Sequence, residues 1–214
     1  MTPADVITEV RRLVQDQVTP YRYSDAVLLG YVNQTMKRMA ILRPDLFTDI
    51  VDIPTTASSA VQGLPADAIR LVDIFQVKGG NAITEVDRET MNRNYPGWMN
   101  EAAGTPVNFM RHVKNPDRYF LYPRPAAGIV LVGEYAKSPI DYTISTTIDV
   151  ISDTYFPVIV DGTVYLAESI DDEHVQSGRA KLFYESFVNQ LSTGLQSRTV
   201  TDTKMAGMES GEVI

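Results

Sequence analysis

The side chains best able to do chemistry lie in one acidic run in the last quarter of the chain. The run consists of Glu168, Asp171, Asp172, Glu173 and His174. Helical spacing would bring Glu168 and Asp172 onto one face, where carboxylate oxygens and one imidazole suit a divalent cation. Acidic side chains are also favoured beside the start of a helix by the helix dipole, without any ion. We favour this second interpretation and expect neither a metal site nor another cofactor.

Few other residues could support catalysis. The chain has two histidines, His112 and His174, and no cysteine. His112 lies inside a predicted strand, where a single histidine is more often a surface or core residue than a general base. No Gly-x-Ser-x-Gly sequence occurs, and residues 78–81 (Lys-Gly-Gly-Asn) lack the Lys-Ser/Thr that ends a phosphate-binding loop. We therefore expect a protein that is not an enzyme, with a turn at residues 78–81.

Aromatic side chains gather in the middle of the chain, close to basic ones. The aromatic residues are Tyr95, Trp98, Phe109, Tyr119, Phe120 and Tyr122, and the basic ones are Arg111, Lys114, Arg118 and Arg124. Exposed rings could stack on sugars or bases, as in carbohydrate- or oligonucleotide-binding β modules. Alternating aromatics also fill the core of a β domain while arginines face a neighbouring subunit. We favour the core interpretation and keep a binding β module on a helical base as the alternative.

Residues 21–45 are predicted to hold a complete amphipathic helix, because both of its ends are marked. Ser24 or Asp25 can accept free backbone N–H groups at its start, and Pro44 disfavours helical backbone at Arg43. The apolar residues at helical spacing are Val27, Leu28, Tyr31, Val32, Met36, Met39 and Leu42. A shorter amphipathic helix starts at Thr2-Pro3, and two such helices joined by a short turn are expected to pack antiparallel.

The middle of the chain has the period of strands. Strands are predicted over 47–53, 68–78, 107–113, 118–122 and 129–135, with a short helix over 87–94. The Gly-Gly-Asn turn should lead residues 82–84 back along the strand 68–78. The helical period returns at Phe156, giving one helix up to Asp171-Asp172 and another from Glu173 to about residue 195.

This order of elements predicts an α+β protein in which the N- and C-terminal helices form a four-helix bundle with an inserted small antiparallel β module. The bundle is assigned to residues 1–46 and 154–195, and the β-rich insertion to residues 47–153. Residues 196–214 are predicted to form an extended C-terminal arm that orders on a partner. The apolar residues of this arm are Val200, Met205, Met208, Val213 and Ile214.

Composition narrows the class of protein further. The 214 residues carry 19 Lys and Arg against 27 Asp and Glu, a formal charge of −8, without a basic run. A protein that grips nucleic-acid phosphates should be basic instead. The N-terminus lacks the pattern of a signal peptide, and no stretch reaches the roughly twenty apolar residues of a membrane span. We therefore expect synthesis in the cytoplasm and no membrane partner.

Several short motifs, in order over residues 20–190, give a resemblance to a known family. They are Leu42-Arg43-Pro44-Asp45, Asp87-Arg88-Glu89 leading to Pro96-Gly97-Trp98, Tyr122-Pro123-Arg124-Pro125, and Asp172-Glu173 followed by Arg179-Ala180 and Phe183-Tyr184. In their order and spacing the chain resembles the head-to-tail adaptor proteins of tailed bacteriophages, also called head completion or connector proteins. The resemblance implies a structural virion protein that combines a helical bundle with a β insertion.

The resemblance also implies partners and a location. Such adaptors assemble as a homo-oligomeric ring, here expected to be a dodecamer, beneath the portal protein of a DNA-filled head, and join it to the tail or nozzle protein. The expected location is the head–tail junction of the virion, after synthesis in the host cytoplasm. Duplex DNA would pass through the ring without sequence-specific binding, and an acidic surface suits this because like charge keeps phosphates from adsorbing.

A ring needs two different faces that meet between neighbouring subunits. The most concentrated opposite charges on the helical half are the basic Lys37, Arg38 and Arg43 and the acidic Glu168, Asp171 and Asp172. We expect the three basic residues to contact the three acidic residues of the neighbouring subunit. The arm of residues 196–214 is expected to contact the portal or a neighbouring subunit.

Overall fold

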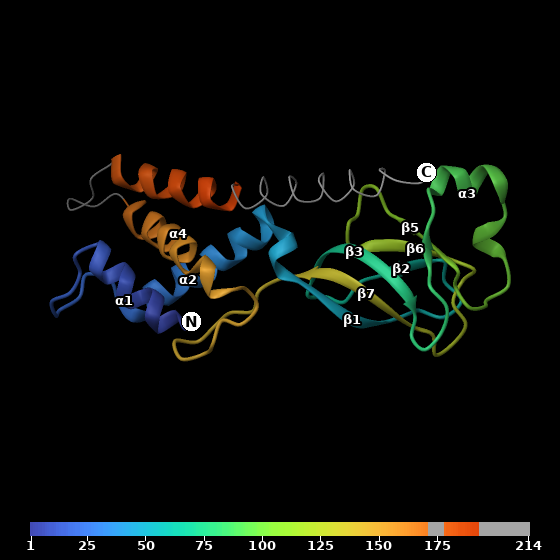
Figure 1. Ribbon diagram of the computed structural model, residues 1–214, viewed down its shortest axis with the longest axis horizontal. Helices are drawn as coiled ribbons and strands as arrows, with labels where there is room; N and C mark the ends of the chain where they lie inside the picture. The colour runs from blue at the N-terminus through green and yellow to red at the C-terminus, as the bar shows by residue number, and fades with distance from the viewer. Residues whose placement is uncertain (171–177, 193–214) are drawn as a thin grey trace, which may run out of the picture. The chain divides into compact units, whose positions relative to one another are not determined.

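The structure is a computed structural model that describes residues 1–170 and 178–192. The chain divides into two compact units, one of Met1–Arg43 with Pro139–Ile214 and one of Pro44–Ser138. The first unit is helical and the second consists mainly of antiparallel sheet (Figure 1). The predicted α+β class is therefore confirmed.

The first helix of the helical unit, α1, spans Pro3–Leu13 and is capped by its own sequence. The Thr2 side-chain oxygen accepts the backbone N–H of Asp5, and the Asp5 carboxylate accepts the backbone N–H of Thr2 at 2.7 Å. The hydrogen bond from the Thr2 backbone holds the pKa of Asp5 below its ordinary value. This reciprocal pair satisfies two backbone donors and fixes where α1 begins.

The second helix, α2, spans Asp25–Leu42 and ends as predicted, with non-helical backbone at Arg43. The Ser24 hydroxyl accepts the N–H of Val27 at 3.3 Å and caps its start. The buried residues are Leu28, Val32, Thr35, Met36, Met39 and Ala40. Val27 and Leu42, expected on the buried face, are 41% and 52% exposed. They stand in the first and last turns of α2, so the predicted apolar stripe was too long at both ends.

The helix α4 spans Phe156–Glu168 and is apolar on most sides. It packs against α1 and α2, and Figure 1 shows it between α1 and a last helix over residues 178–192. Gly162 permits a close approach, because a Cβ there would lie 2.5 Å from Thr35 Cγ2 and 3.0 Å from the Phe187 ring. A helix that is apolar nearly all round is typical of one covered on several sides. The centre of the helical unit is therefore α4.

The helix over residues 178–192 is held by buried side chains and by polar contacts. Phe187 and Leu191 are almost fully buried. The Ser186 hydroxyl donates to Asp161 Oδ2 of α4 at 2.6 Å, and the Arg179 guanidinium donates to the Leu13 carbonyl of α1. The four helices are thus connected through shared contacts, while their arrangement as a four-helix bundle stays a prediction.

Residues 139–153 form an irregular segment of the helical unit. The Asn33 side chain of α2 donates to the Tyr142 carbonyl at 3.1 Å and accepts the Tyr142 N–H at 2.9 Å. Two backbone bonds tie the segment to the N-terminus, from Ala4 N–H to the Ile144 carbonyl and from Ile148 N–H to the Met1 carbonyl. The predicted β-rich insertion of residues 47–153 includes this segment, because the helical period returns only at Phe156.

The second unit contains two sheets. The first has the order β1-β7-β3, all antiparallel, with β1 at Thr48–Pro54, β3 at Ala68–Val77 and β7 at Val130–Lys137. The second has the order β2-β6-β5-β4, with β2 at Val61–Gly63, β4 at Thr84–Glu85, β5 at Asn108–Arg111 and β6 at Arg118–Tyr122. Among these strand pairs, the two-residue pairing of β4 with β5 is parallel.

The second sheet is buried on both faces, because alternate residues of a strand point to opposite sides. Phe109 and Tyr119 join the core that both sheets share, with residues such as Ile74 and Leu131. The residues that follow them, Met110 and Phe120, join a second core with residues of α3 (Arg88–Asn94) and of the short 3-10 helix η2 (Trp98–Asn100). This second core consists of Ala60, Met91, Trp98, Met110 and Phe120.

The predicted turn after β3 is present. The backbone N–H of Val77 donates to the Asn81 carbonyl, and the N–H of Ile83 donates to the Phe75 carbonyl, both at 3.0 Å. Gly79 has φ +70, a conformation that glycine adopts without a steric cost. The chain then leaves β3 and pairs with β5 instead, so the hairpin is only a few residues long.

Candidate functional site

The basic residues predicted for a subunit interface lie in three different environments. Lys37 Nζ forms an ion pair with Asp141 Oδ1 at 2.6 Å inside the helical unit. The Arg38 guanidinium is exposed and lies 5.5 Å from the centre of the Tyr165 ring of α4. Arg43 is 2% exposed and donates to the Leu191 carbonyl. Of these three side chains, Arg38 is the one that presents its charge to solvent without an ion pair among the described residues.

The acidic residues predicted for the opposite face are only partly described. Glu168 is 4% exposed, and its Oε1 lies 3.8 Å from the Arg179 guanidinium in the same unit. Asp171 and Asp172 lie outside the described residues. The five apolar residues predicted for the arm, from Val200 to Ile214, also lie outside them. Glu168 is therefore part of the interior of the helical unit, and no described carboxylate joins it to form the predicted acidic corner.

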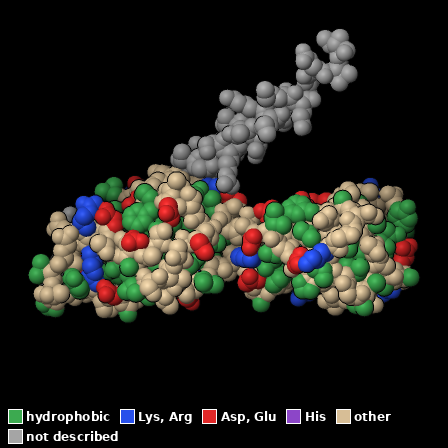
Figure 2. Space-filling view, turned by 60° about the horizontal axis from the view of Figure 1, so that its bottom comes forward, with side chains coloured by type: hydrophobic (Ala, Val, Ile, Leu, Met, Phe, Trp, Pro, Cys, Tyr) green, Lys and Arg blue, Asp and Glu red, His purple; other side chains and the backbone are tan. Residues whose placement is uncertain are grey.

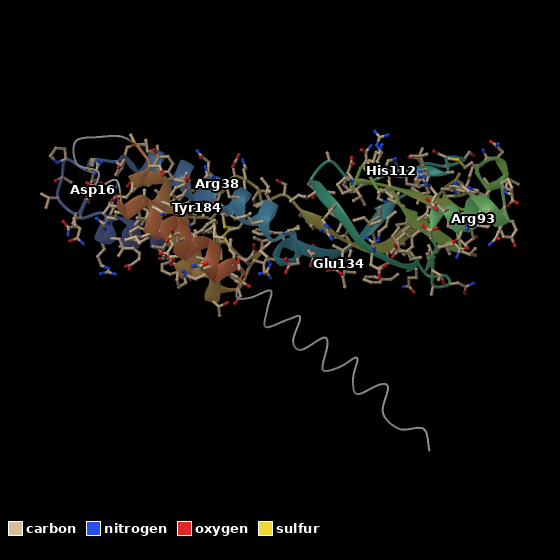
Figure 3. All side chains as sticks on the ribbon, turned by 90° about the horizontal axis from the view of Figure 1, so that it is seen from above. Asp16, Arg38, Arg93, His112, Glu134 and Tyr184 are labelled. Carbon is tan, nitrogen blue, oxygen red and sulfur yellow. The ribbon has the colours of Figure 1, made fainter. Side chains whose placement is uncertain are left out.

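Arg38 belongs to an exposed patch that three helices share. The Tyr165 ring of α4 lies 5.0 Å from the Tyr184 ring of helix 178–192, and Figure 3 shows Arg38 and Tyr184 close together. Tyr184 is 46% exposed, and Ile41 and Leu42, at i+3 and i+4 from Arg38, are 74% and 52% exposed. We call these five residues the Arg38 patch. Tyrosine and arginine are the residue types enriched in protein interfaces.

A buried ionic network fixes the loop between α1 and α2. Arg11 donates to Asp16 Oδ2 and to Asp25 Oδ1, both at 2.6 Å, and to the Tyr23 carbonyl at 2.8 Å. The ring of Tyr21 lies 3.8 Å from the Arg11 guanidinium carbon. Asp16 also accepts the backbone N–H groups of the loop. The loop is therefore held rigidly by one side chain of α1, a role that no sequence motif indicated.

An open groove of about 450 Å3 lies beside this network. Its lining residues are Ala4, Ile7, Thr8, Arg11, Gln17, Tyr21, Asp25 and Ile144. They come from α1, from the loop, from the start of α2 and from the segment 139–153. Because Ile144 is distant in sequence from the other lining residues, which lie between Ala4 and Asp25, no local pattern could have predicted the complete groove.

The aromatic residues of the second unit do not form the stacking platform considered from the sequence. Phe109 and Tyr119 lie in the core between the sheets, and Trp98 and Phe120 lie in the core beneath α3. Tyr95 remains exposed, with its ring 6.1 Å from that of Tyr122. Four of the six aromatic side chains therefore fill a core of the β unit, as the favoured interpretation predicts.

Two of the arginines near these rings, Arg111 and Arg124, stabilise the unit itself. Arg111 pairs with Glu85 at 2.7 Å and donates to the carbonyls of Leu71 and Val72. Arg124 donates to the Glu101 carbonyl at 2.8 Å. Figure 2 shows acidic and basic side chains interspersed on the displayed face of the described residues, without a continuous basic surface. The distribution on this face does not suit phosphate binding.

His112 has a structural role in the second unit. Its ring stacks on Phe120 at 5.6 Å, and its Nδ1 accepts the backbone N–H groups of Lys114 and Asn115. His174 lies outside the described residues. Across residues 1–170 and 178–192, no group of three or more His, Cys, Asp or Glu side chains is arranged to hold a metal ion.

Comparison with known proteins assigns a family. A model of the SU10 adaptor protein family matches residues 1–209 and so covers elements of both units. Curated proteins give no match. In the described part of the chain, no helix has both the length and the apolar character needed to cross a membrane. Because the family match extends over nearly the whole sequence, the resemblance drawn from the short motifs is confirmed: the chain belongs to the SU10 adaptor protein family, a family of phage head–tail adaptors and structural virion proteins.

Proposed function

We propose that this protein assembles as a ring that joins the portal protein of a phage head to the tail or nozzle protein. The observation that carries the proposal is the family match over residues 1–209. Twelve copies are proposed for the ring, with its location at the head–tail junction of the virion and its synthesis in the host cytoplasm. The function is mechanical and needs no catalysis.

The helical unit is proposed to be the rigid part of the ring. Contacts from Phe187, Ser186 and Arg43 support a four-helix bundle, because they connect helix 178–192 to both α4 and the end of α2. The unit of Pro44–Ser138 is proposed as the insertion that reaches a partner. Residues 196–214 are proposed as an arm that binds the portal or a neighbouring subunit.

The passage of DNA through the ring is supported by charge. The formal charge of −8 and the interspersed acidic side chains would repel phosphates, so that duplex DNA slides without adsorbing. The proposed subunit interface keeps Arg38 as its exposed cation. Arg43 and Glu168 are left out of it because both are buried within one subunit, and Lys37 already pairs with Asp141.

Assembly is tested by mass photometry and negative-stain electron microscopy of the purified chain, alone and with a portal protein. We expect closed rings of twelve copies in at least one of the two samples. A monomer in both samples would refute the ring. Deleting residues 196–214 should weaken attachment to the portal while the circular dichroism spectrum and melting temperature stay unchanged. Unchanged attachment would remove the proposed role of the arm.

A further inference from the structure

We propose that the groove beside Arg11 on one copy receives the Arg38 patch of a second copy of this chain. The inference rests on the proposed ring, and it names the two surfaces that would meet between neighbouring subunits. Both surfaces are exposed in a single copy, and both combine apolar side chains with charge.

The Arg38 patch offers what an inserted surface needs. Ile41, Leu42 and Tyr184 present large apolar side chains to solvent at 74%, 52% and 46% exposure. Arg38 stands among them and contacts the Tyr165 ring rather than a carboxylate of the described residues. Burying these side chains against a second copy would remove apolar surface from water and would leave one cation in need of an anion.

The groove offers the complementary features. Ile7, Tyr21 and Ile144 supply apolar lining. Two carboxylates, Asp16 and Asp25, face one guanidinium, so the network beside the groove is negative overall. The Asp25 side chain is 56% exposed although one of its oxygens binds Arg11, so it can still accept hydrogen bonds from an incoming arginine. The negative charge beside the groove is therefore complementary to the positive charge of Arg38 in the Arg38 patch.

The two surfaces lie toward opposite ends of α2, which makes the contact head-to-tail. Asp25 begins α2 and Leu42 ends it, a separation of about 25 Å along the helix axis. Figure 3 shows Asp16 at one end of the helical unit, away from Arg38 and Tyr184. When the groove of one copy binds the Arg38 patch of another, the pair still has one free groove and one free Arg38 patch. Further copies can therefore add until a ring closes.

Engineered cysteines test this contact directly, because the natural chain has none. Leu42→Cys and Ile144→Cys are introduced together in the full chain, which is oxidised with copper phenanthroline at micromolar concentration. A disulfide within one copy would leave a monomer on the gel, so a ladder of larger species reports contacts between copies, whose Cα atoms must come within about 7 Å. We expect a ladder of covalent multimers on a non-reducing gel, and a covalent dimer when the two single variants are mixed.

The matched control carries Ile50→Cys and Val113→Cys, two side chains of the other unit that are 61% and 87% exposed. We expect no ladder from this control. If the natural chain forms rings while Leu42→Cys/Ile144→Cys gives no ladder, that result would overturn the groove contact and leave the proposed function standing. A ladder from a chain that forms no closed ring, either alone or with the portal protein, would support the contact and refute the ring. A monomer in both samples without any ladder would refute both.

Charge reversal gives an independent measurement in solution. Arg38→Glu places a carboxylate against Asp25 of the second copy, and we expect self-association to weaken at least tenfold in sedimentation experiments. Lys181→Glu serves as the control, because Lys181 is exposed on helix 178–192 and pairs only weakly with Glu185 at 3.6 Å. Equal effects of the two variants would overturn the inference.

Discussion

Two arginines near the C-terminal end of α2 show how position decides the role of a side chain. Arg43 is buried and binds the Leu191 carbonyl, whereas Arg38 is exposed and lies over the Tyr165 ring. A buried guanidinium cannot be removed without leaving a cavity and a carbonyl that has lost its donor. An exposed guanidinium over an aromatic ring contributes much less.

Arg43→Ala is therefore expected to lower the free energy of unfolding by about 2–4 kcal/mol. Arg38→Ala is expected to change it by no more than about 1 kcal/mol. Urea denaturation followed by circular dichroism measures both. If the two variants unfold at the same urea concentration, Arg43 does not connect α2 to helix 178–192.

Tyr119 presents the opposite case, a buried hydroxyl without a hydrogen-bond partner among the described residues. Burial raises the pKa of Tyr119 above its ordinary value. A raised pKa in the folded state means that the unfolded chain releases the proton first as the pH rises. The contribution of Tyr119 to stability is thus fully present below about pH 10 and is lost at higher pH.

Tyr119→Phe is expected to leave stability at pH 7 unchanged or to raise it, because no hydrogen bond is lost. Its melting temperature should also fall less steeply than that of the natural chain between about pH 10 and pH 11. Tyr135→Phe is the control, since the Tyr135 hydroxyl donates to Asp67 Oδ1 at 3.2 Å. A loss of stability by Tyr119→Phe at pH 7 would reveal a partner for the hydroxyl.

At the scale of the elements, α4 packs closely against two other helices at Gly162. A methyl group at Gly162 would collide with Thr35 Cγ2 of α2 and with the Phe187 ring of helix 178–192. A methyl group at Gly30 in α2 would meet no heavy atom within 4 Å. Alanine has a higher intrinsic helix propensity than glycine. Substitution by alanine should therefore change the free energy of unfolding in opposite directions at Gly30 and at Gly162.

Gly162→Ala is expected to destabilise the helical unit by about 1–3 kcal/mol, because overpacking outweighs helix propensity. Gly30→Ala should stabilise it by up to about 1 kcal/mol. Thermal denaturation of both variants measures this difference. A stabilising Gly162→Ala would mean that α2 and helix 178–192 do not enclose α4, and the proposed bundle would be wrong.

At the scale of the whole molecule, the insertion has the connections of an independent domain. Its two ends lie on adjacent strands, because Thr48 of β1 pairs with Ala136 of β7. It also has its own core between the two sheets. A domain with adjacent termini and its own core can be removed without breaking its sheets.

A fragment of residues 44–138 is therefore expected to fold alone, with a single cooperative thermal transition and a dispersed amide NMR spectrum. Leu131→Ala, which truncates a fully buried side chain of this core, serves as the control and should lower the melting temperature. A fragment without a cooperative transition would show that the second unit depends on the first.

The acidic character of the molecule leads to a further prediction. At about 150 mM salt the natural chain should bind duplex DNA more weakly than about 10⁻⁴ M, the weak end of non-specific binding. Fluorescence anisotropy with a labelled duplex measures this. A variant with lysine at Asp141, Asp149, Asp153 and Glu185 is the positive control, and micromolar binding by the natural chain would contradict the proposed sliding of DNA.

What the sequence determined by itself is local. The cap at Ser24, the end of α2 before Pro44 and the turn at residues 78–81 each depend on interactions within a few residues. The α+β class follows from the order of helical and strand periods. The short motifs that gave the resemblance are contiguous stretches as well, so the family could be predicted from residues that are neighbours in the chain.

Tertiary structure alone decided which charges face solvent and which surfaces exist. Arg43 and Glu168 look like surface charges in sequence, yet packing of helices far apart in the chain buries both. Residues 139–153 join the helical unit through Asn33 and the N-terminus, contacts that span more than a hundred residues. The Arg38 patch and the groove beside Arg11 are assembled from several segments each. Burial and clustering depend on which distant segments meet, and periodicity within one segment carries no information about that.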